Sequence, residues 1–135
     1  MQRISYLIFS NELCYNKSET LNLTDDSLMI GSIVKVIVDR PLGTFHPKHK
    51  DIYYSVNYGY IADIVAPDGE EQDAYILGIN KPVKEFVGRV IAIIHRFDDV
   101  EEKWVVAPED TSFTKDEIMR QVAFQEQYFC TEIRL

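Results

Sequence analysis

The chain has 135 residues, of which 22 are Asp or Glu and 14 are Lys or Arg, giving a formal net charge of −8. This length suits one domain with a real hydrophobic core, and a hydrophobic fraction of 46% is ordinary for a soluble globular protein. The negative charge argues against nucleic-acid binding through phosphates, and no apolar run approaches the length of a membrane span. We therefore expect a cytoplasmic protein with neither a nucleic-acid nor a membrane partner.

The two cysteines, Cys14 and Cys130, lie far apart in the sequence and form no CxxC pair. Such spacing offers no dense disulfide framework. This pattern favours reduced thiols.

Residues 1–28 are rich in Asn and Ser and show weak periodicity. They form either a short extra element, such as an edge strand at residues 4–9, or an extension ahead of an alternative start at Met29. We favour the poorly packed extension. The division is therefore an extension at residues 1–28 and one domain at residues 29–135.

Five segments after residue 32 have the β-branched and aromatic composition of strands. Gly, Pro and Asn separate them, as expected of turns. Several short strands in one small domain predict a closed or nearly closed barrel. The predicted strands are residues 33–38, 53–60, 74–79, 88–95 and 104–107.

A helix is predicted after the last strand. Thr114 with Glu117 three residues later fits a capping box. Apolar residues then recur at helical spacing, which gives one face to pack on the barrel. These apolar residues are Ile118, Met119, Val122 and Phe129. The predicted fold class is mainly β with helix (α+β), a small OB-like five-stranded barrel with a C-terminal helix.

An acidic segment, DGEEQD at residues 68–73, lies in a predicted turn between two strands. Gly69 allows a tight bend, so Asp68, Glu70 and Asp73 could converge. Carboxylate oxygens are the ligands that Mg²⁺ prefers. An acidic surface turn is also commonly just solvated, so the segment alone leaves both interpretations open.

A second acidic group, at residues 98–102, stands directly before Lys103. It is either a solvated hairpin loop or part of a site. A Lys at the start of an apolar strand can protect the strand at the surface, or it can reach a phosphate as a point charge. Neither a GxxxxGK[ST] phosphate loop nor a nucleophile elbow is present.

Taken together, these segments resemble the family I soluble inorganic pyrophosphatases. Residues 57–61 read NYGYI and are followed by the acids at positions 68, 70 and 73, where that family has Asn-Tyr-Gly-Tyr/Phe and then Asp-Gly-Asp-Pro-x-Asp. Matching segments continue in order through GRVI at residues 88–91 and KWVVAP at residues 103–108. The resemblance covers roughly residues 33–130.

The resemblance implies magnesium-dependent hydrolysis of pyrophosphate by direct attack of metal-activated water, in a homo-oligomer. The metal ligands that it implies are Asp68, Glu70, Asp73, Asp98 and Glu101. Glu70 and Asp73 would also be catalytic, together with Tyr58, which would hydrogen-bond a phosphate oxygen.

The resemblance also implies phosphate contacts from Lys48, Lys103 and Tyr128. Arg40 is the nearest substitute for a phosphate-clamping Arg of the family, which sits on a hairpin missing here between Lys48 and residue 57. Asp39 could order water around a metal.

Other positions depart from the family pattern. Glu70 and Glu101 stand where the family has Asp, and Phe129 stands where it has Lys. These departures leave two alternatives open, a hydrolase of the same fold acting on another diphosphate and a non-catalytic barrel that binds metal or phosphate.

Overall fold

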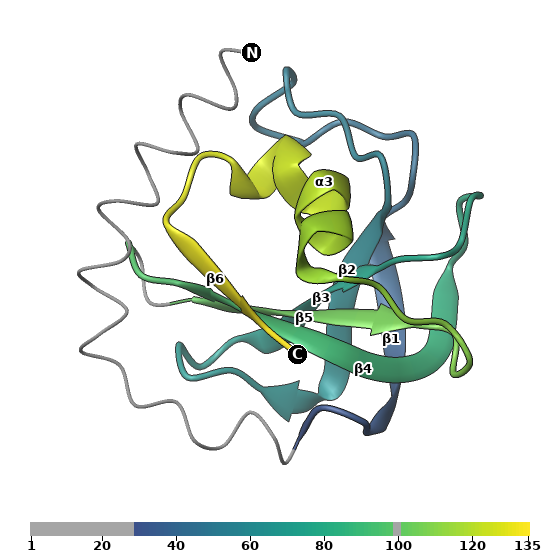
Figure 1. Ribbon diagram of the computed structural model, residues 1–135. Helices are drawn as coiled ribbons and strands as arrows, with labels where there is room; N and C mark the ends of the chain where they lie inside the picture. The colour runs from purple at the N-terminus through teal and green to yellow at the C-terminus, as the bar shows by residue number, and fades with distance from the viewer. Residues whose placement is uncertain (1–28, 99–100) are drawn as a thin grey trace.

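The computed structural model describes residues 29–98 and 101–135 (Figure 1). The predicted extension at residues 1–28 lies outside the described residues. The elements are, in chain order, β1 (Ile33–Arg40), β2 (Asn57–Val65), β3 (Glu71–Ile76), β4 (Glu85–Arg96), β5 (Glu102–Ala107), α3 (Lys115–Glu126) and β6 (Thr131–Arg134).

Five of the strands close into a mixed barrel. β1 pairs antiparallel with both β2 and β4, β2 pairs antiparallel with β3, and β5 pairs parallel with β3 and antiparallel with β4. Figure 1 shows α3 lying across this sheet. The predicted OB-like barrel with a C-terminal helix is therefore confirmed. β6, which the sequence did not predict, adds to β4 as a sixth strand.

The barrel closes tightly where β1 meets β2. Val38 is paired with Gly59, and a Cβ atom on Gly59 would lie 1.8 Å from the carbonyl oxygen of Ile37. Every residue other than glycine carries such a Cβ atom, so only glycine fits there. The NYGYI segment thus owes its Gly to strand packing.

Strands β3 and β5 are buried on both faces. Successive residues of a strand point to opposite faces, so Tyr75 and Val105 join one hydrophobic cluster while Ile76 and Val106 join the other. The first cluster also contains side chains of α3. The helix therefore covers the Tyr75 face of the sheet, and this face leads to the candidate site.

The helix begins as predicted. The Thr114 hydroxyl accepts a hydrogen bond from the Glu117 N–H, and the Glu117 carboxylate accepts one from the Thr114 N–H. The predicted extension of the helical face to Phe129 is wrong, because the helix ends at Glu126 and Gln127 is its C-cap.

None of the helices in the described residues combines the length and the apolar character needed to cross a membrane. The Cys130 sulfur is in a disulfide bond, which contradicts the predicted reduced thiol. Cys14, the other cysteine of the chain, lies outside the described residues.

Candidate functional site

A cavity of about 520 Å³ is bounded by residues from β1 to β5, by the loop between β1 and β2, and by the end of α3. Three cationic side chains and four carboxylates line it, with two histidines. These are Arg40, Arg96 and Lys103, then Asp39, Asp51, Asp73 and Glu101, then His46 and His49. The remaining lining residues are Ile52, Tyr58, Gln125, Tyr128 and Phe129. The carboxylates outnumber the cations, so a bare polyanion would meet no net positive charge here.

Lys103 lies at the centre of this charge pattern. Its Nζ is 2.5 Å from Asp73 Oδ2, 2.7 Å from Glu101 Oε1 and 3.0 Å from the Tyr58 hydroxyl. Burial lowers the pKa of the ammonium, but the neighbouring Tyr58 and Asp73 outweigh it, so the pKa lies above its ordinary value. The buried side chain therefore remains charged at neutral pH.

Strand geometry brings these partners together. Asp73 is paired with Tyr60 and Tyr75 with Tyr58, so Tyr58 and Asp73 lie on the same face of the β2–β3 pair. The parallel pairing of β3 with β5 then places Lys103 beside them. Burial raises the pKa of Tyr58, whose hydroxyl stays protonated and can donate to an oxyanion.

Arg96 is held by a buried carboxylate. Its Nε and Nη2 donate to Glu126 at 2.9 and 2.7 Å, and the Glu126 side chain is fully buried. The guanidinium lies 3.7 Å from the centre of the Phe129 ring, and its Nη1 is 3.6 Å from Glu101. Burial lowers the pKa of Arg96, but hydrogen bonding to Glu126 outweighs it and raises that pKa above its ordinary value.

Arg40 forms a second side of the cavity. Its Nη1 donates to the Tyr54 hydroxyl at 2.6 Å, and the guanidinium lies 5.6 Å from the ring centres of both Tyr54 and Tyr58. The adjacent Asp39 is partly buried, and this burial raises the pKa of its carboxyl above the ordinary value. Asp39 and Asp73 both line the cavity, and the Asp73 charge also raises the pKa of Asp39.

The loop between β1 and β2 is held by Asn57 and His46. The Asn57 side chain accepts from the Leu42 N–H at 2.9 Å and donates to the Lys81 carbonyl at 2.9 Å. His46 Nδ1 accepts from the backbone N–H groups of Lys48 and His49. Burial, followed by the charge of Arg40, lowers the pKa of His46, so its ring is neutral at pH 7.

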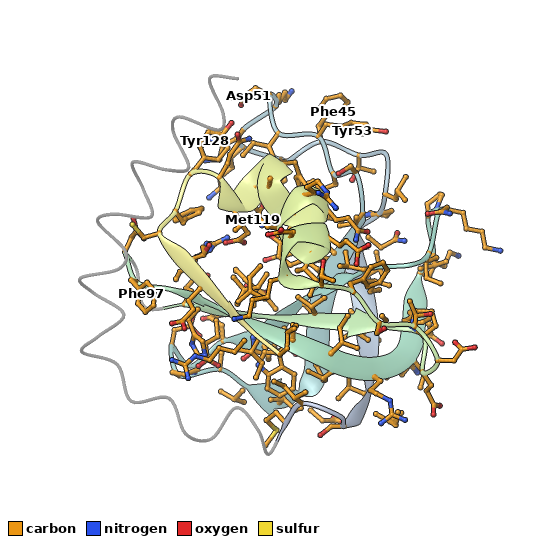
Figure 2. The ribbon with its side chains drawn as sticks, in the orientation of Figure 1. Phe45, Asp51, Tyr53, Phe97, Met119 and Tyr128 are labelled. Atoms are coloured by element: carbon orange, nitrogen blue, oxygen red, sulfur yellow. The ribbon has the colours of Figure 1, made fainter. Side chains whose placement is uncertain are left out.

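The structure brings together some of the sequence-predicted site residues. Seven of them line the cavity, namely Asp39, Arg40, Tyr58, Asp73, Glu101, Lys103 and Tyr128. Figure 2 shows Tyr128 just past the end of α3, at the same end of the molecule as Asp51, another cavity residue.

The structure does not place the other predicted site residues on the cavity wall. Asp68 and Glu70 are exposed in the β2–β3 turn, where the Asp68 carboxylate accepts from the Glu70 N–H. The Asp98 carboxylate accepts from the Cys130 N–H, and the Lys48 side chain is exposed. Gly69 has a φ of +89°, which confirms the tight bend predicted there.

The chemistry of the cavity carboxylates fits a divalent cation. Asp39, Asp73 and Glu101 offer the hard oxygen ligands that Mg²⁺ prefers. Within residues 29–98 and 101–135, however, no three His, Cys, Asp or Glu side chains are already arranged as a metal site. The cation that Asp73 and Glu101 hold in this structure is the Lys103 ammonium.

The sequence analysis did not predict five polar residues of the cavity wall, nor Glu126, which holds Arg96. The five are His46, His49, Asp51, Arg96 and Gln125. A signal for two of these six residues exists in the helix. Gln125 and Glu126 follow Val122 by three and four residues, so they lie on the same apolar face of α3. A polar residue on an apolar face needs a buried partner, which Tyr75 provides for both.

No protein-family model matches the chain, and no curated protein matches its sequence. Solved structures do match its fold. An inorganic pyrophosphatase from Ehrlichia chaffeensis aligns with a TM-score of 0.60 at 17% identity, over 83% of this chain and 90% of that one. The enzyme from Neisseria gonorrhoeae aligns with a TM-score of 0.57 at 19% identity, over 73% and 74% of the two chains. The enzyme from Helicobacter pylori gives 0.54 at 15%, over 85% and 86%.

These neighbours support the resemblance that the motifs indicated. The fold, a barrel with a C-terminal helix, aligns over most of both chains, although fewer than one residue in five is identical. The chain therefore has the fold of the inorganic pyrophosphatases that it resembles.

Proposed function

We propose that this protein hydrolyses inorganic pyrophosphate to phosphate in the cavity around Lys103, with a divalent cation, Mg²⁺ first among the candidates. One observation carries the proposal. Cationic groups that suit phosphate oxygens and carboxylates that suit a hard cation line the same cavity, in a barrel shared with pyrophosphatases. A pyrophosphate–metal complex carries both kinds of partner at once.

Each group in the cavity has a role in this proposal. Lys103, Arg40 and the Tyr58 hydroxyl bind and orient phosphate oxygens. Tyr128 contributes a hydroxyl at the exposed side of the cavity. The ligands proposed for the cation are Asp39, Asp73 and Glu101. When bound, the cation would lower the pKa of a water molecule and so supply a nucleophile at neutral pH.

The sequence-based ligand set is wider than this one. Asp68, Glu70 and Asp98 remain proposed ligands from the resemblance, but their side chains are not on the cavity wall in this structure. Lys48 likewise remains a proposed phosphate contact from the resemblance, and its side chain is not on the cavity wall either. A homo-oligomer and a cytoplasmic location also remain predictions from sequence.

The test is phosphate release from pyrophosphate, with and without added Mg²⁺. We expect release that needs the metal and is abolished by Asp73→Asn. Asp110→Asn is the matched control, because it makes the same change at an exposed carboxylate that does not line the cavity. Purified protein that releases no phosphate with any of several divalent metals would exclude this function. Asp68→Asn is a third variant, and a loss of phosphate release in it would support a place for the β2–β3 turn in the metal site.

A non-catalytic phosphate-binding protein is the second candidate. It is favoured by the contacts of Lys103, which already neutralises the two carboxylates that a metal would use. In that case calorimetry would detect pyrophosphate binding in the absence of Mg²⁺, and no phosphate would be released.

A hydrolase of a larger diphosphate is the third candidate. The cavity volume of about 520 Å³ lies within the range of pockets that hold organic ligands. A substrate panel of nucleotide and sugar diphosphates tests it, since a higher kcat/KM for one of these than for pyrophosphate would identify the larger substrate.

A further inference from the structure

A hydrogen-bonded relay connects the two arginines of the cavity through the core. Arg40 donates to the Tyr54 hydroxyl at 2.6 Å, and Tyr54 donates to Gln125 Oε1 at 2.5 Å. Gln125 Nε2 donates to the Tyr75 hydroxyl at 2.7 Å. Tyr75 donates to Glu126 Oε2 at 2.5 Å, and the Glu126 carboxylate accepts two hydrogen bonds from Arg96. We call these six residues the Gln125 relay.

The donors and acceptors of the relay are all determined. Arginine can only donate and the Glu126 carboxylate only accepts, so each tyrosine hydroxyl must accept on one side and donate on the other. Gln125 stands between the two hydroxyls and must accept from Tyr54 and donate to Tyr75. Its amide meets both demands in a single orientation, which fixes which atom is Oε1 and which is Nε2.

The relay is buried for most of its length. Tyr54 and Tyr75 are fully buried, and Gln125 and Glu126 are 7% and 1% exposed. Buried hydrogen bonds lose little strength to competing water, and one unsatisfied member weakens the whole network. Only its ends, Arg40 and Arg96, and the Gln125 side chain reach the cavity wall.

We propose that Gln125 is a positioning residue that holds the guanidinium groups of Arg40 and Arg96 in place for a phosphate-bearing ligand. This inference rests on the proposed function, because it assumes that the cavity binds phosphate groups. Gln125 acts through its neighbours in this role. It orients Tyr54, which orients Arg40, and it supports Tyr75, which shares Glu126 with Arg96.

Gln125→Leu tests the role by removing both the acceptor and the donor at similar size. We expect the Kd for pyrophosphate, measured by calorimetry, to rise roughly tenfold or more, because one or two oriented hydrogen bonds in a low-dielectric site are worth about that factor. Gln127→Leu is the matched control. It makes the same change two residues further along, where Nε2 donates to the Phe124 carbonyl at 3.5 Å, and it should bind as the wild type does.

Gln125→Glu separates positioning from mere packing. A protonated Glu has one donor and one acceptor and can reproduce the amide pattern, whereas an ionised Glu only accepts and leaves the Tyr75 hydroxyl without a donor. The ratio of variant to wild-type affinity should therefore fall as the pH rises. In Gln125→Leu the same ratio should not change with pH. Contacts join position 125 to the titratable and charged groups Tyr54, Tyr75, Glu126, Arg40 and Arg96. The Tyr58 and His46 rings lie beside Tyr54, and the Lys103 ammonium lies beside Tyr58.

Tyr54→Phe provides a second, smaller perturbation if Gln125→Leu does not fold. It breaks the relay between Arg40 and Gln125 and leaves the Tyr75–Glu126–Arg96 half intact, so a smaller loss of affinity is expected. The proposal would be overturned if the Gln125→Leu variant or the Tyr54→Phe variant bound pyrophosphate as tightly as the wild type. It would also be overturned if the ratio of Gln125→Glu affinity to wild-type affinity did not change with pH.

These outcomes are distinct from failure of the proposed function. Wild-type protein that binds pyrophosphate without releasing phosphate would exclude hydrolysis but leave the relay test intact. Wild-type protein that binds neither pyrophosphate nor phosphate, with or without Mg²⁺, would overturn both proposals.

Discussion

The Arg96–Glu126 pair gives the most quantitative prediction. Glu126 is fully buried and accepts three hydrogen bonds, two from Arg96 and one from Tyr75. In Glu126→Gln the amide keeps one acceptor oxygen, and its NH₂ group points at one of these donors. The change leaves a guanidinium that is only 6% exposed without its main counter-charge.

Breaking a buried ion pair from one side costs about 3–5 kcal/mol. We expect the lower end of this range, about 3 kcal/mol, because Glu101 still lies 3.6 Å from Arg96 and is one-third exposed. For a domain of this size such a loss lowers Tm by about 10–15 °C.

Urea unfolding followed by circular dichroism measures the loss as a shift in midpoint at constant slope. Glu109→Gln is the matched control, since Glu109 pairs with Arg89 at 3.3 Å but is 66% exposed. That variant should lose less than about 1 kcal/mol. Equal stability of the two variants would refute the reasoning.

The double variant Arg96→Met with Glu126→Leu tests whether the loss of stability comes from the charge of Arg96. Removing both charges avoids a buried guanidinium that has lost its Glu126 counter-charge, so the double variant should be more stable than Glu126→Gln alone. It should not recover fully, because the Tyr75 hydroxyl loses its acceptor. A double variant less stable than Glu126→Gln would mean that side-chain packing, and not the lost counter-charge, dominates the cost.

Three further predictions concern individual residues. Lys103→Met should raise the Kd for pyrophosphate at least about tenfold by calorimetry, because it removes a charge-assisted contact, and unchanged affinity would contradict the phosphate role. Gly59→Ala should destabilise the barrel by more than about 3 kcal/mol in urea unfolding, because its Cβ would lie 1.8 Å from the Ile37 oxygen; a folded variant of near-native stability would refute the close approach. Asp39→Asn should be more stable than the wild type at pH 7 but not at acidic pH, because burial raises the pKa of Asp39 and its ionisation as pH rises then costs more in the folded state than in the unfolded one. Thermal unfolding across pH checks the sign, and a variant less stable at pH 7 would contradict it.

The strands were predictable because their signal is local. Each of the five barrel strands overlaps a β-branched or aromatic segment, although the boundaries moved, as in β2, which begins at Asn57 and not at residue 53. The parallel pairing of β3 with β5 has no local signature, because it joins segments about 30 residues apart. β6 is four residues long and depends on the exposed edge of β4, so its own sequence carried little information.

Whether a predicted site residue reaches the cavity depends on the kind of element on which it lies. Predicted residues within strands, such as Tyr58, Asp73 and Lys103, reach the cavity, because strand register fixes where their side chains point. Of the predicted residues outside the strands, Glu101 and Tyr128 reach the cavity, whereas Asp68, Glu70, Asp98 and Lys48 do not. Their positions depend on the shape of each loop, which periodicity does not describe.

The contacts inside the cavity also bear on how a ligand would enter it. Lys103 is paired with Asp73 and Glu101, while Arg96 is paired with Glu126. A phosphate group that took the Lys103 ammonium would remove this cation from Asp73 and from Glu101, which also has the Arg96 guanidinium 3.6 Å away. A divalent cation that took the two carboxylates would remove these anions from the ammonium. Either ligand alone thus breaks contacts that it does not replace. When the phosphate and the divalent cation bind together, the phosphate pairs with the ammonium and the cation pairs with the carboxylates, so every charge keeps a counter-charge. We therefore expect the phosphate and the cation to raise each other's affinity by the same factor.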